Sequence, residues 1–308
     1  MEYTVGIVTY ERPESIGSPL DSLLSQTRLP DELLIVDDSD SSRTTQVVES
    51  FRPKFEAAGV RLSYTRRSGG RSMPGARNDI IEAATGDVVC FIDDDVVCEE
   101  SWLAAIDDGY SRDDVAAVCG PAIRTDQDLM PTDTRITDQT NRNTISEYGE
   151  VNEISHCWIP PSPVETEAGR GANMSFRISA LEAIGGFDTR YEGPAVFEEW
   201  DVMARLKQRG FDLLYQPEAT VYHFETEEGG ARTDDNVRPT SYWYAKNSLL
   251  FRRKNFRETF YRSVALLFFV GTSQLPPIWR RIAALVALDT SQIAWLKGYW
   301  HGLSANTA

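Results

Sequence analysis

Three consecutive aspartates, Asp93, Asp94 and Asp95, follow directly on the apolar run VVCFI. Adjoining carboxylates repel one another unless a cation is present, and open α/β sheets bind ligands at the carboxyl ends of their strands. If the backbone stays extended, Asp93 and Asp95 project to the same side. Oxygen ligands favour Mg²⁺ or Mn²⁺, so the sequence predicts a site for one of these ions. The alternative is a solvated acidic run, but such a run seldom abuts a buried strand without an intervening turn residue.

A second carboxylate pair, Glu198 and Glu199, lies where a helix is expected to begin. The pair has the residue type of a general base, but acids in a first helical turn also complement the helix dipole, as Asp201 would. His223 ends the apolar run ATVY and is one of only three histidines. A single histidine at a strand end is more often structural than a ligand. From the residues alone, both roles stay open at each of these positions.

Asp37 and Asp38 follow the apolar run LLIV, where an acid can accept hydrogen bonds from a ribose or a base. An N-cap or an Asx turn is the alternative, which the neighbouring serines also suit. Four arginines nearby have the geometry to pair with phosphate: Arg66, Arg67, Arg71 and Arg77. No Lys-Ser/Thr follows the Gly-Gly pair in this stretch, and no Gly-x-Gly-x-x-Gly follows the first apolar run. ATPase and nicotinamide-binding functions therefore lack their motifs.

Alternating apolar runs and amphipathic stretches position these residues. The runs TVGIVTY, ELLIVDD, VRLSYT, DVVCFIDDD and VAAVCGPAI are rich in β-branched residues, which predicts strands buried on both faces. The stretches between them predict helices, one beginning near Pro74 and followed by a turn at Gly86, and hence a βαβ series with a mostly parallel sheet. Residues 125–167 lose this rhythm and are predicted to form a long surface excursion that carries acceptor or partner contacts.

The segments beyond residue 167 return to regular patterns. RGANMSFR predicts a strand, ISALEAIGGFD a helix ending at Gly185 and Gly186, and FEEWDVMARLKQRG a helix ending at Gly210. DLLYQ and ATVYHF predict two more strands.

The C-terminal tail is basic and aromatic. From Phe251 to Ala308 the sequence has eight basic and two acidic residues. Its longest apolar run, Val264–Gly271, falls short of the about 20 residues that cross a bilayer, so the tail is not expected to span one. The tail either lies on an anionic membrane surface or packs as terminal helices. Its aromatic residues include Trp279, Trp295, Tyr299 and Trp300.

The overall composition bounds the remaining possibilities. A chain of 308 residues allows one large or two moderate domains, and 41% hydrophobic with 25% charged residues is typical of a globular protein. The net charge of −16 disfavours a nucleic-acid partner. Four cysteines without a Cys-x-x-Cys pair, and an acidic N-terminal segment, favour a reduced, cytoplasmic protein. Lysine supplies only five of the 31 basic residues, and this acid excess predicts a halophilic, archaeal source.

The ordered series of segments resembles glycosyltransferase family 2 on the GT-A fold. The resemblance covers residues 3–255, from IVTYERPE and LLIVDDSDS through GARNDIIEAATGD and FIDDD to GANMSFR, EEWDVMARLKQRG and VYH. It implies an α/β fold with a Rossmann-like, mostly parallel central sheet, flanking helices and a C-terminal helical tail. The implied divisions are a GT-A domain over 1–255, with a nucleotide-binding half (1–124) and an acceptor-binding half (125–255), followed by basic, aromatic helices over 256–308.

The resemblance also implies roles for particular residues. Asp93 and Asp95 would hold Mg²⁺ or Mn²⁺, with His223 as an extra ligand. Gly171 and Asn173 would border the donor sugar. The remaining implied nucleotide contacts are Thr9, Tyr10, Arg12, Asp38, Arg77 and, to the ribose, Asp94.

In many relatives, the second acid of a Glu-Asp pair before a helix deprotonates the acceptor. Here this position is Glu199, and because Glu replaces the usual Asp, the assignment to Glu199 rather than Glu198 stays open. The implied activity is inverting transfer of a sugar from a nucleotide sugar to an acceptor hydroxyl, without a covalent intermediate. The basic tail suggests a lipid-linked glycan acceptor and a peripheral position on the cytoplasmic face of an anionic membrane.

Two other functions stay open at this point. The run ending in Asp93-x-Asp95 also resembles the motif of haloacid-dehalogenase-type phosphatases, in which the first aspartate is a nucleophile. That family places its motif near the N-terminus, whereas three strands are expected before it here. A sugar- or lipid-binding module that keeps the fold without turnover is the other alternative.

Overall fold

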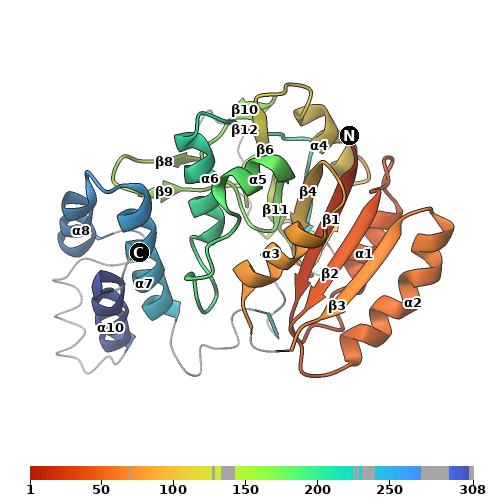
Figure 1. Ribbon diagram of the computed structural model, residues 1–308, viewed down its shortest axis with the longest axis horizontal. Coiled ribbons are helices and arrows are strands. Elements are labelled where there is room, and N and C mark those ends of the chain that lie inside the picture. The colour runs from red at the N-terminus through yellow and green to blue at the C-terminus, as the bar shows by residue number, and fades with distance from the viewer. Residues whose placement is uncertain are drawn as a thin grey trace.

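Eight strands form the central sheet of the computed structural model, which describes residues 1–68, 71–126, 129–132, 143–224, 226, 229–230, 240–271 and 291–304. In spatial order these strands are β10 (Val164–Glu165), β12 (Asp212–Tyr215), β6 (Val115–Cys119), β11 (Asn173–Arg177), β4 (Val88–Ile92), β1 (Tyr3–Thr9), β2 (Glu32–Asp37) and β3 (Arg61–Arg66). β4, β1, β2 and β3 are parallel, as are β6 and β12, whereas β11 is antiparallel to both its neighbours. The predicted α/β architecture is confirmed (Figure 1).

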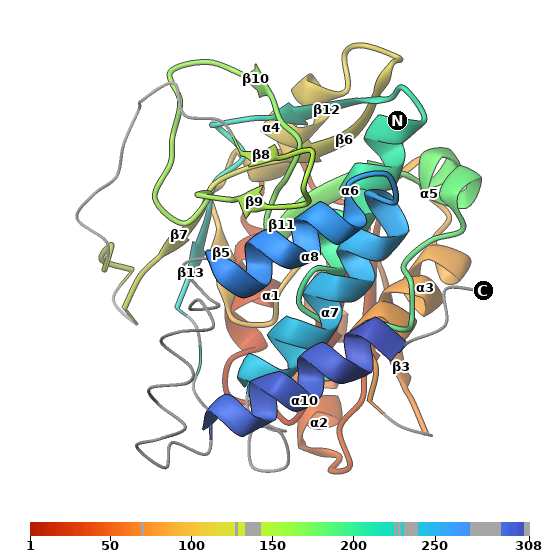
Figure 2. The same ribbon diagram turned by 90° about the vertical axis from the view of Figure 1, so that its left-hand side faces the viewer.

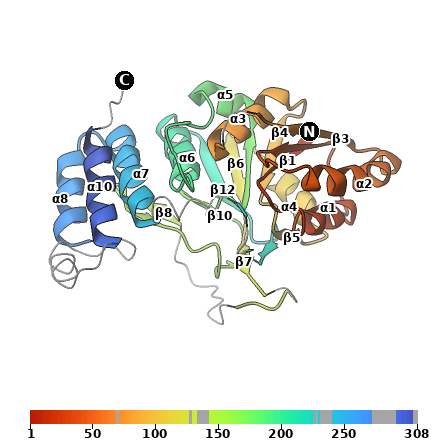
Figure 3. The ribbon, with the colours of Figure 1, turned by 90° about the horizontal axis from the view of Figure 1, so that it is seen from below.

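Helices cover both faces of this sheet because its strands are apolar on both sides (Figure 3). One face packs against α1 (Gly17–Leu24), α2 (Arg43–Ala57) and α4 (Trp102–Gly109). The other packs against α3 (Met73–Ala83), α5 (Ile178–Ile184) and α6 (Glu198–Gln208). Successive residues of β4 alternate between the two cores, with Cys90 and Ile92 in the first and Val89 and Phe91 in the second.

A smaller sheet splits the predicted strand VAAVCGPAI and contains one strand, β5, that was not predicted. Its strands are β5 (Val96–Cys98), β13 (Val221–His223) and β7 (Ala122–Arg124), in this order. The backbone turns at Asp94 and Asp95 instead of continuing β4 in an extended conformation, so β5 leaves the central sheet. Gly120 and Pro121 separate β6 from β7, and a Cβ on Gly120 would lie 2.0 Å from the carbonyl oxygen of Ala219. The small sheet places His223 beside the aspartate turn.

Part of the segment 125–167 is in the core, so the prediction of a surface excursion is wrong for its later residues. Trp158 is 1% exposed, and its ring centroid lies 4.5 Å from that of Tyr215. The segment also contains the small hairpin of β8 (Thr144–Ile145) and β9 (Val151–Asn152). Residues 127–128 and 133–142 lie outside the described residues.

The tail helices form a layer at one end of the molecule (Figure 2). These are α7 (Thr240–Asn255), α8 (Phe260–Phe269) and α10 (Ser291–Ser304). Trp295 and Tyr299 of α10 are buried in a cluster with Ala245 and Leu249 of α7, as expected of packed terminal helices, whereas Trp300 is 70% exposed. Trp279 lies outside the described residues.

Within the described part of the chain, no helix is both long and apolar enough to cross a bilayer. An ion pair ties α7 to the helix that carries the acidic pair, with Lys254 Nζ 2.8 Å from Asp201 Oδ2. The predicted boundary between residues 255 and 256 falls between α7 and α8, and it stays a prediction.

Candidate active site

A cavity of about 620 Å³ lies at the carboxyl ends of β1, β2 and β4. This volume is typical of small-molecule sites. Parallel strands expose the turns that follow them along one edge, which brings residues from distant segments together. The predicted site residues that line the cavity are Thr9, Tyr10, Arg12, Asp38, Arg77, Asp93, Asp94, Asp95, Gly171, Glu198, Glu199 and His223.

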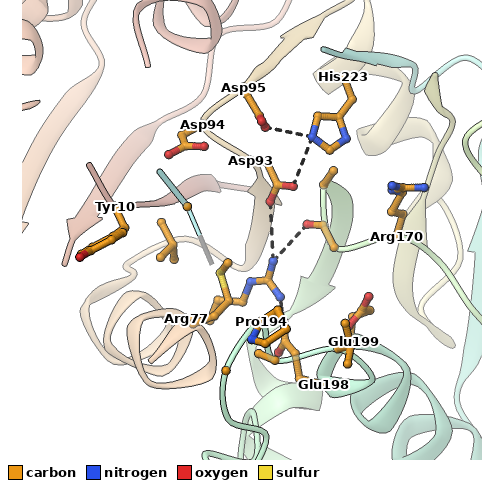
Figure 4. A pocket seen from close by; sticks show the side chains of 18 of the residues that line it. Tyr10, Arg77, Asp93, Asp94, Asp95, Arg170, Pro194, Glu198, Glu199 and His223 are labelled. Atoms are coloured by element: carbon orange, nitrogen blue, oxygen red, sulfur yellow. Dashed lines mark hydrogen bonds and ion pairs between the residues drawn. The ribbon is translucent and has the colours of Figure 1, made fainter. Parts of the chain in front are cut away.

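Asp93, Asp95 and His223 converge on one side of the cavity (Figure 4). His223 Nε2 lies 2.9 Å from Asp95 Oδ1 and 3.8 Å from Asp93 Oδ2. Asp95 Oδ1 is buried and makes no hydrogen bond of good geometry within the described residues, so the 2.9 Å approach of His223 Nε2 is its polar contact there; His223 Nδ1 has no hydrogen bond either. A buried carboxylate oxygen without a hydrogen bond carries a desolvation cost that a cation would offset. Two carboxylates and an imidazole are a donor set that fits a divalent transition metal such as Mn²⁺.

Arg12 lies on the opposite side of this carboxylate cluster from His223. Its Nη1 is 2.8 Å from both Asp94 Oδ1 and Asp95 Oδ2, and Thr9 Oγ1 donates to Asp94 Oδ2 at 2.6 Å. Burial raises the pKa of Asp94 to about 7, against the lowering effect of Arg12. Burial also acts to raise the pKa of Asp95, but His223, Arg12 and the Thr226 amide outweigh it and lower that pKa. Of Asp94 and Asp95, Asp95 is therefore the one held in its ionised form.

The end of the cavity next to β1 and β2 contains Tyr10 and Asp38. The Arg71 guanidinium lies 4.4 Å from the centroid of the Tyr10 ring. Asp38 Oδ2 accepts a hydrogen bond from the Ser72 amide at 3.1 Å, and Arg67 lies 3.2 Å from its carboxylate. The neighbouring Asp37 instead forms the Asx turn considered above, because its Oδ1 accepts from the Ser39 amide at 2.8 Å.

Arg77 lies at the centre of the site and is 5% exposed. Its Nη1 forms a close ion pair with Glu198 Oε1. Its Nη2 donates to the Gly171 carbonyl at 3.3 Å and lies 3.9 Å from Asp93 Oδ1 (Figure 4). Burial of this guanidinium lowers the pKa of Arg77, against the raising effect of Asp93. Arg77 thus connects the aspartate turn to the start of α6.

The backbone before α6 is left-handed at two residues that are not glycine. Ala195 has φ of 52° and Phe197 has φ of 79°, which costs on the order of 1–3 kcal/mol per residue and is found mainly at functional sites. The Phe197 ring is held by Trp200 and Tyr244, each with its centroid 5.0 Å away. This turn directs Glu198 toward Arg77 and leaves Glu199 to line the cavity beside it (Figure 4).

Glu199 is the acid with the environment of a base. Burial raises the pKa of Glu199 to about 7, with a further raising effect from Glu153 and lowering effects from Arg77 and Arg170. A carboxylate with a pKa near neutrality can accept a proton and release it again. Among the described residues, no ion pair engages its side chain, in contrast to Glu198.

One predicted site residue does not line the cavity. Asn173 is 0% exposed, and both the nitrogen and the oxygen of its side-chain amide form hydrogen bonds inside the protein. Its Nδ2 donates to the carbonyls of Pro121 and Ala219 at 2.8 and 2.7 Å, and its Oδ1 accepts from the Trp102 indole at 2.9 Å. The proposed contact of Asn173 with the donor sugar is therefore corrected: this side chain joins the two sheets.

Other residues that line the cavity were not identified as site residues from the sequence. Trp200, next to Glu199, and Arg170, next to Gly171, had a nearby signal, whereas the others come from segments without a recognisable motif. The charged and aromatic members of this set are Arg124, Glu153, His156, Arg170, Trp200 and Tyr244.

Comparison with known proteins agrees with this geometry. The sequence profile described as "Glycosyl transferase family 2" matches residues 4–160, about half of the chain. The protein belongs to glycosyltransferase family 2. It is a glycosyltransferase by family, which removes the phosphatase alternative: the Asp93-x-Asp95 motif belongs to this family's pattern.

Two relatives extend the likeness beyond the matched residues. A Haloferax volcanii protein described as glucosyl-dolichyl phosphate glucuronosyltransferase is 27% identical over 243 residues, covering 72% of this chain and 69% of its own. The amylovoran biosynthesis glycosyltransferase AmsB of Erwinia amylovora is 28% identical over 264 residues, covering 79% and 76%.

Solved structures confirm the GT-A fold of this family 2 chain. The mannosyltransferase PcManGT from Pyrobaculum calidifontis, in complex with GDP-Man and Mn²⁺, superposes with a TM-score of 0.62 at 17% identity, covering 98% of this chain and 87% of its own. TarS of S. aureus, in complex with UDP-GlcNAc, superposes with a TM-score of 0.54 at 16% identity, covering 97% and 89%. At such identity the likeness concerns the fold alone.

Proposed function

We propose that this glycosyltransferase is metal-dependent and inverting, and that it moves a sugar from a nucleotide sugar to an acceptor hydroxyl. The observation that carries this proposal is the placement of Asp93, Asp95 and His223 on one wall of a cavity that also contains Glu199. A leaving diphosphate requires positive charge, and an acceptor hydroxyl requires a base. The two requirements are met by different walls of one cavity.

Asp93, Asp95 and His223 would hold the ion. When bound, Mg²⁺ or Mn²⁺ would neutralise charge on the departing diphosphate. The imidazole nitrogen makes Mn²⁺ the better match of the two, because Mg²⁺ prefers an all-oxygen set. The fold relative PcManGT is described with Mn²⁺, which agrees with this choice.

Glu199 would accept the proton of the acceptor hydroxyl, because it lines the cavity and its pKa is raised to about 7. Glu198 is already paired with Arg77, so its place is to fix that guanidinium. Direct displacement with inversion needs one base and no nucleophilic carboxylate, so Glu199 is sufficient for the reaction we propose. Thr9, Tyr10 and Asp38 would bind the nucleotide base, Asp94 the ribose and Gly171 the donor sugar.

Glu199→Gln tests this assignment. The variant keeps the shape of the side chain but cannot accept the proton, so it should bind donor normally and transfer about 10²- to 10⁴-fold more slowly. Donor binding is measured by metal-dependent thermal stabilisation over a panel of nucleotide sugars. Normal transfer by Glu199→Gln contradicts the role of Glu199. Nucleotide binding by the wild-type protein without hydrolysis or transfer of any donor, with Mn²⁺ present, supports the non-catalytic binding module instead.

We further propose that the acceptor is a lipid-linked glycan and that α8 rests on an anionic membrane. α8 has an exposed apolar stripe in a strongly acidic protein: Tyr261 is 85%, Leu266 44%, Phe269 64% and Val270 65% exposed. The exposed Arg257 and Arg262 lie just before α8 and in its first turn, and their charge matches anionic lipid headgroups. One relative is described as acting on a dolichyl phosphate glycan, which supports a lipid-linked acceptor. A cytoplasmic location, from the four free cysteines, stays a prediction.

A further inference from the structure

Tyr244 belongs to the tail helix α7, yet it lines the cavity beside the acids of α6. Its ring packs at 67° against the Phe197 ring, with the centroids 5.0 Å apart. Within the described structure, its hydroxyl has no hydrogen-bond partner. A phenylalanine would pack equally well against Phe197, so packing does not account for the hydroxyl. A polar group that faces a cavity without a protein partner is a candidate ligand contact.

Glu153 enters the same part of the cavity from the segment after β9. Its Oε1 accepts a hydrogen bond from the Ser155 amide at 2.6 Å, which fixes the carboxylate. Burial raises the pKa of Tyr244 to about 12, and Glu199 adds to this effect, as Glu153 adds to the raised pKa of Glu199. Glu199 therefore interacts electrostatically with each of the other two groups.

Trp200 completes this wall of the cavity. Its indole N–H donates to the Gly169 carbonyl at 2.9 Å, and its ring packs at 89° against Phe197. These contacts fix the orientation of a half-buried ring. A pyranose presents an apolar face of C–H groups, which aromatic rings can cover, and an edge of hydroxyls, which carboxylates and tyrosine can bind. The nucleotide-binding Tyr10 lies on the opposite side of the site from Glu199 (Figure 4).

We infer that Tyr244, Glu153 and Trp200 form a binding site for a sugar unit of the acceptor. The Tyr244 hydroxyl and the Glu153 carboxylate bind its hydroxyls, and the aromatic rings cover its apolar face. The acceptor unit then lies next to Glu199, which receives the proton. This inference rests on the proposed function and deepens it by naming the residues of this chain that bind the accepting saccharide unit, whatever carries that unit.

The experiment uses methyl glycosides of glucose, galactose, mannose and N-acetylglucosamine as probes, with the full chain, Mg²⁺ and UDP or GDP. Binding is measured by saturation-transfer NMR, and nucleotide affinity by calorimetry. Loss of one hydrogen bond corresponds to a roughly 2- to 12-fold weaker Kd, so we expect this change in Tyr244→Phe and Glu153→Gln and a larger one in Tyr244→Ala. Tyr148→Phe, outside the cavity, is the matched control and should stay within about twofold of wild type.

Nucleotide affinity should be unchanged in all four variants. The inference is overturned if no glycoside binds the wild-type protein, if glycoside Kd values in the Tyr244 variants match wild type, or if nucleotide affinity falls by the same factor as glycoside affinity. Tyr244→Phe keeps the ring and its packing, so it decides the matter even if Tyr244→Ala fails to fold. Hydrolysis of nucleotide sugars by the wild-type protein with Mn²⁺ is scored separately, because its absence would count against the proposed function itself.

Discussion

Arg77 forms a buried ion pair with Glu198, the acid that directly precedes the proposed base Glu199. The pair joins α3 to the first turn of α6, and the second terminal nitrogen of Arg77 faces Asp93 at 3.9 Å. Glu198 thereby holds the Arg77 guanidinium inside the site. The two adjacent glutamates, which have the same side chain, consequently have different environments.

The Arg77–Glu198 pair should be important for stability. Its side chains are 6% and 3% exposed, and removing one partner of a buried pair leaves an uncompensated charge. Arg77→Met and Glu198→Gln should each lower the free energy of unfolding by about 3–5 kcal/mol in urea titrations. The exposed Arg112–Asp114 pair is the control, and Arg112→Met should lower the free energy of unfolding far less, because solvent screens an exposed pair. Equal small losses in both pairs would contradict the structural role of Arg77.

The activity should depend on pH through Glu199. The pKa of Glu199 is raised to about 7, and only the deprotonated carboxylate can accept a proton. Transfer rate should therefore rise with pH up to about 7 and level off above it. Glu199→Asp, which shortens the side chain by one methylene and changes its burial, should shift this limb of the pH–rate profile, whereas His156→Gln should not. A limb that stays in place in Glu199→Asp would assign the titration to another group.

The metal site should need all three of its side chains. Asp95→Asn or His223→Gln removes a ligand, so each should weaken Mn²⁺ binding by more than about 10-fold, as measured by electron paramagnetic resonance of free Mn²⁺. In the wild-type protein, Mn²⁺ at 100 times its Kd should stabilise the fold by about 2.7 kcal/mol, and EDTA should reverse this. His156 lines the same cavity but is not one of the three proposed ligands, so His156→Gln serves as the control. Unchanged Mn²⁺ affinity in His223→Gln would remove His223 from the ligand set.

The exposed stripe of α8 should bind anionic vesicles. The protein should sediment with phosphatidylglycerol vesicles and not with phosphatidylcholine vesicles, and added salt should weaken the attachment. Replacing Phe269 and Val270 by serine removes two apolar side chains that are 64% and 65% exposed, and should reduce binding about 10-fold or more. Met130→Ser, at an exposed residue outside α8, should have no effect. Equal binding by the serine variant would place the membrane contact elsewhere or nowhere.

The charge of −16 predicts a protein adapted to high salt. Repulsion among acidic side chains opposes the compact state, and salt screens it. The melting temperature should therefore rise by several degrees between dilute buffer and molar KCl. A chain that is fully folded and equally stable in dilute buffer would contradict the halophilic prediction.

Much of the fold was predictable because its signals are local. A strand buried on both faces has a short β-branched run, and a helix ends where glycine follows it, as at Gly185 with φ of 77°. The aspartates after β4 were identified for the same reason, because their position relative to the strand end is a property of neighbouring residues. The points at which the chain passes from one sheet to the other were not predictable from local patterns. β4 and β6 belong to the central sheet, whereas β5 and β7, which follow them, belong to the small one.

The sequence by itself determined the order of strands and helices, the family and the set of acids that could do chemistry. Only the tertiary structure decided their environments: Glu198 pairs with Arg77 whereas Glu199 has no ion pair, and Asp38 lines the cavity whereas Asp37 forms a turn. It also turned Asn173 into the interior and brought Tyr244 from α7 to the site. The physical reason is that the environment of a side chain depends on the groups packed around it, and these come from segments far away along the chain.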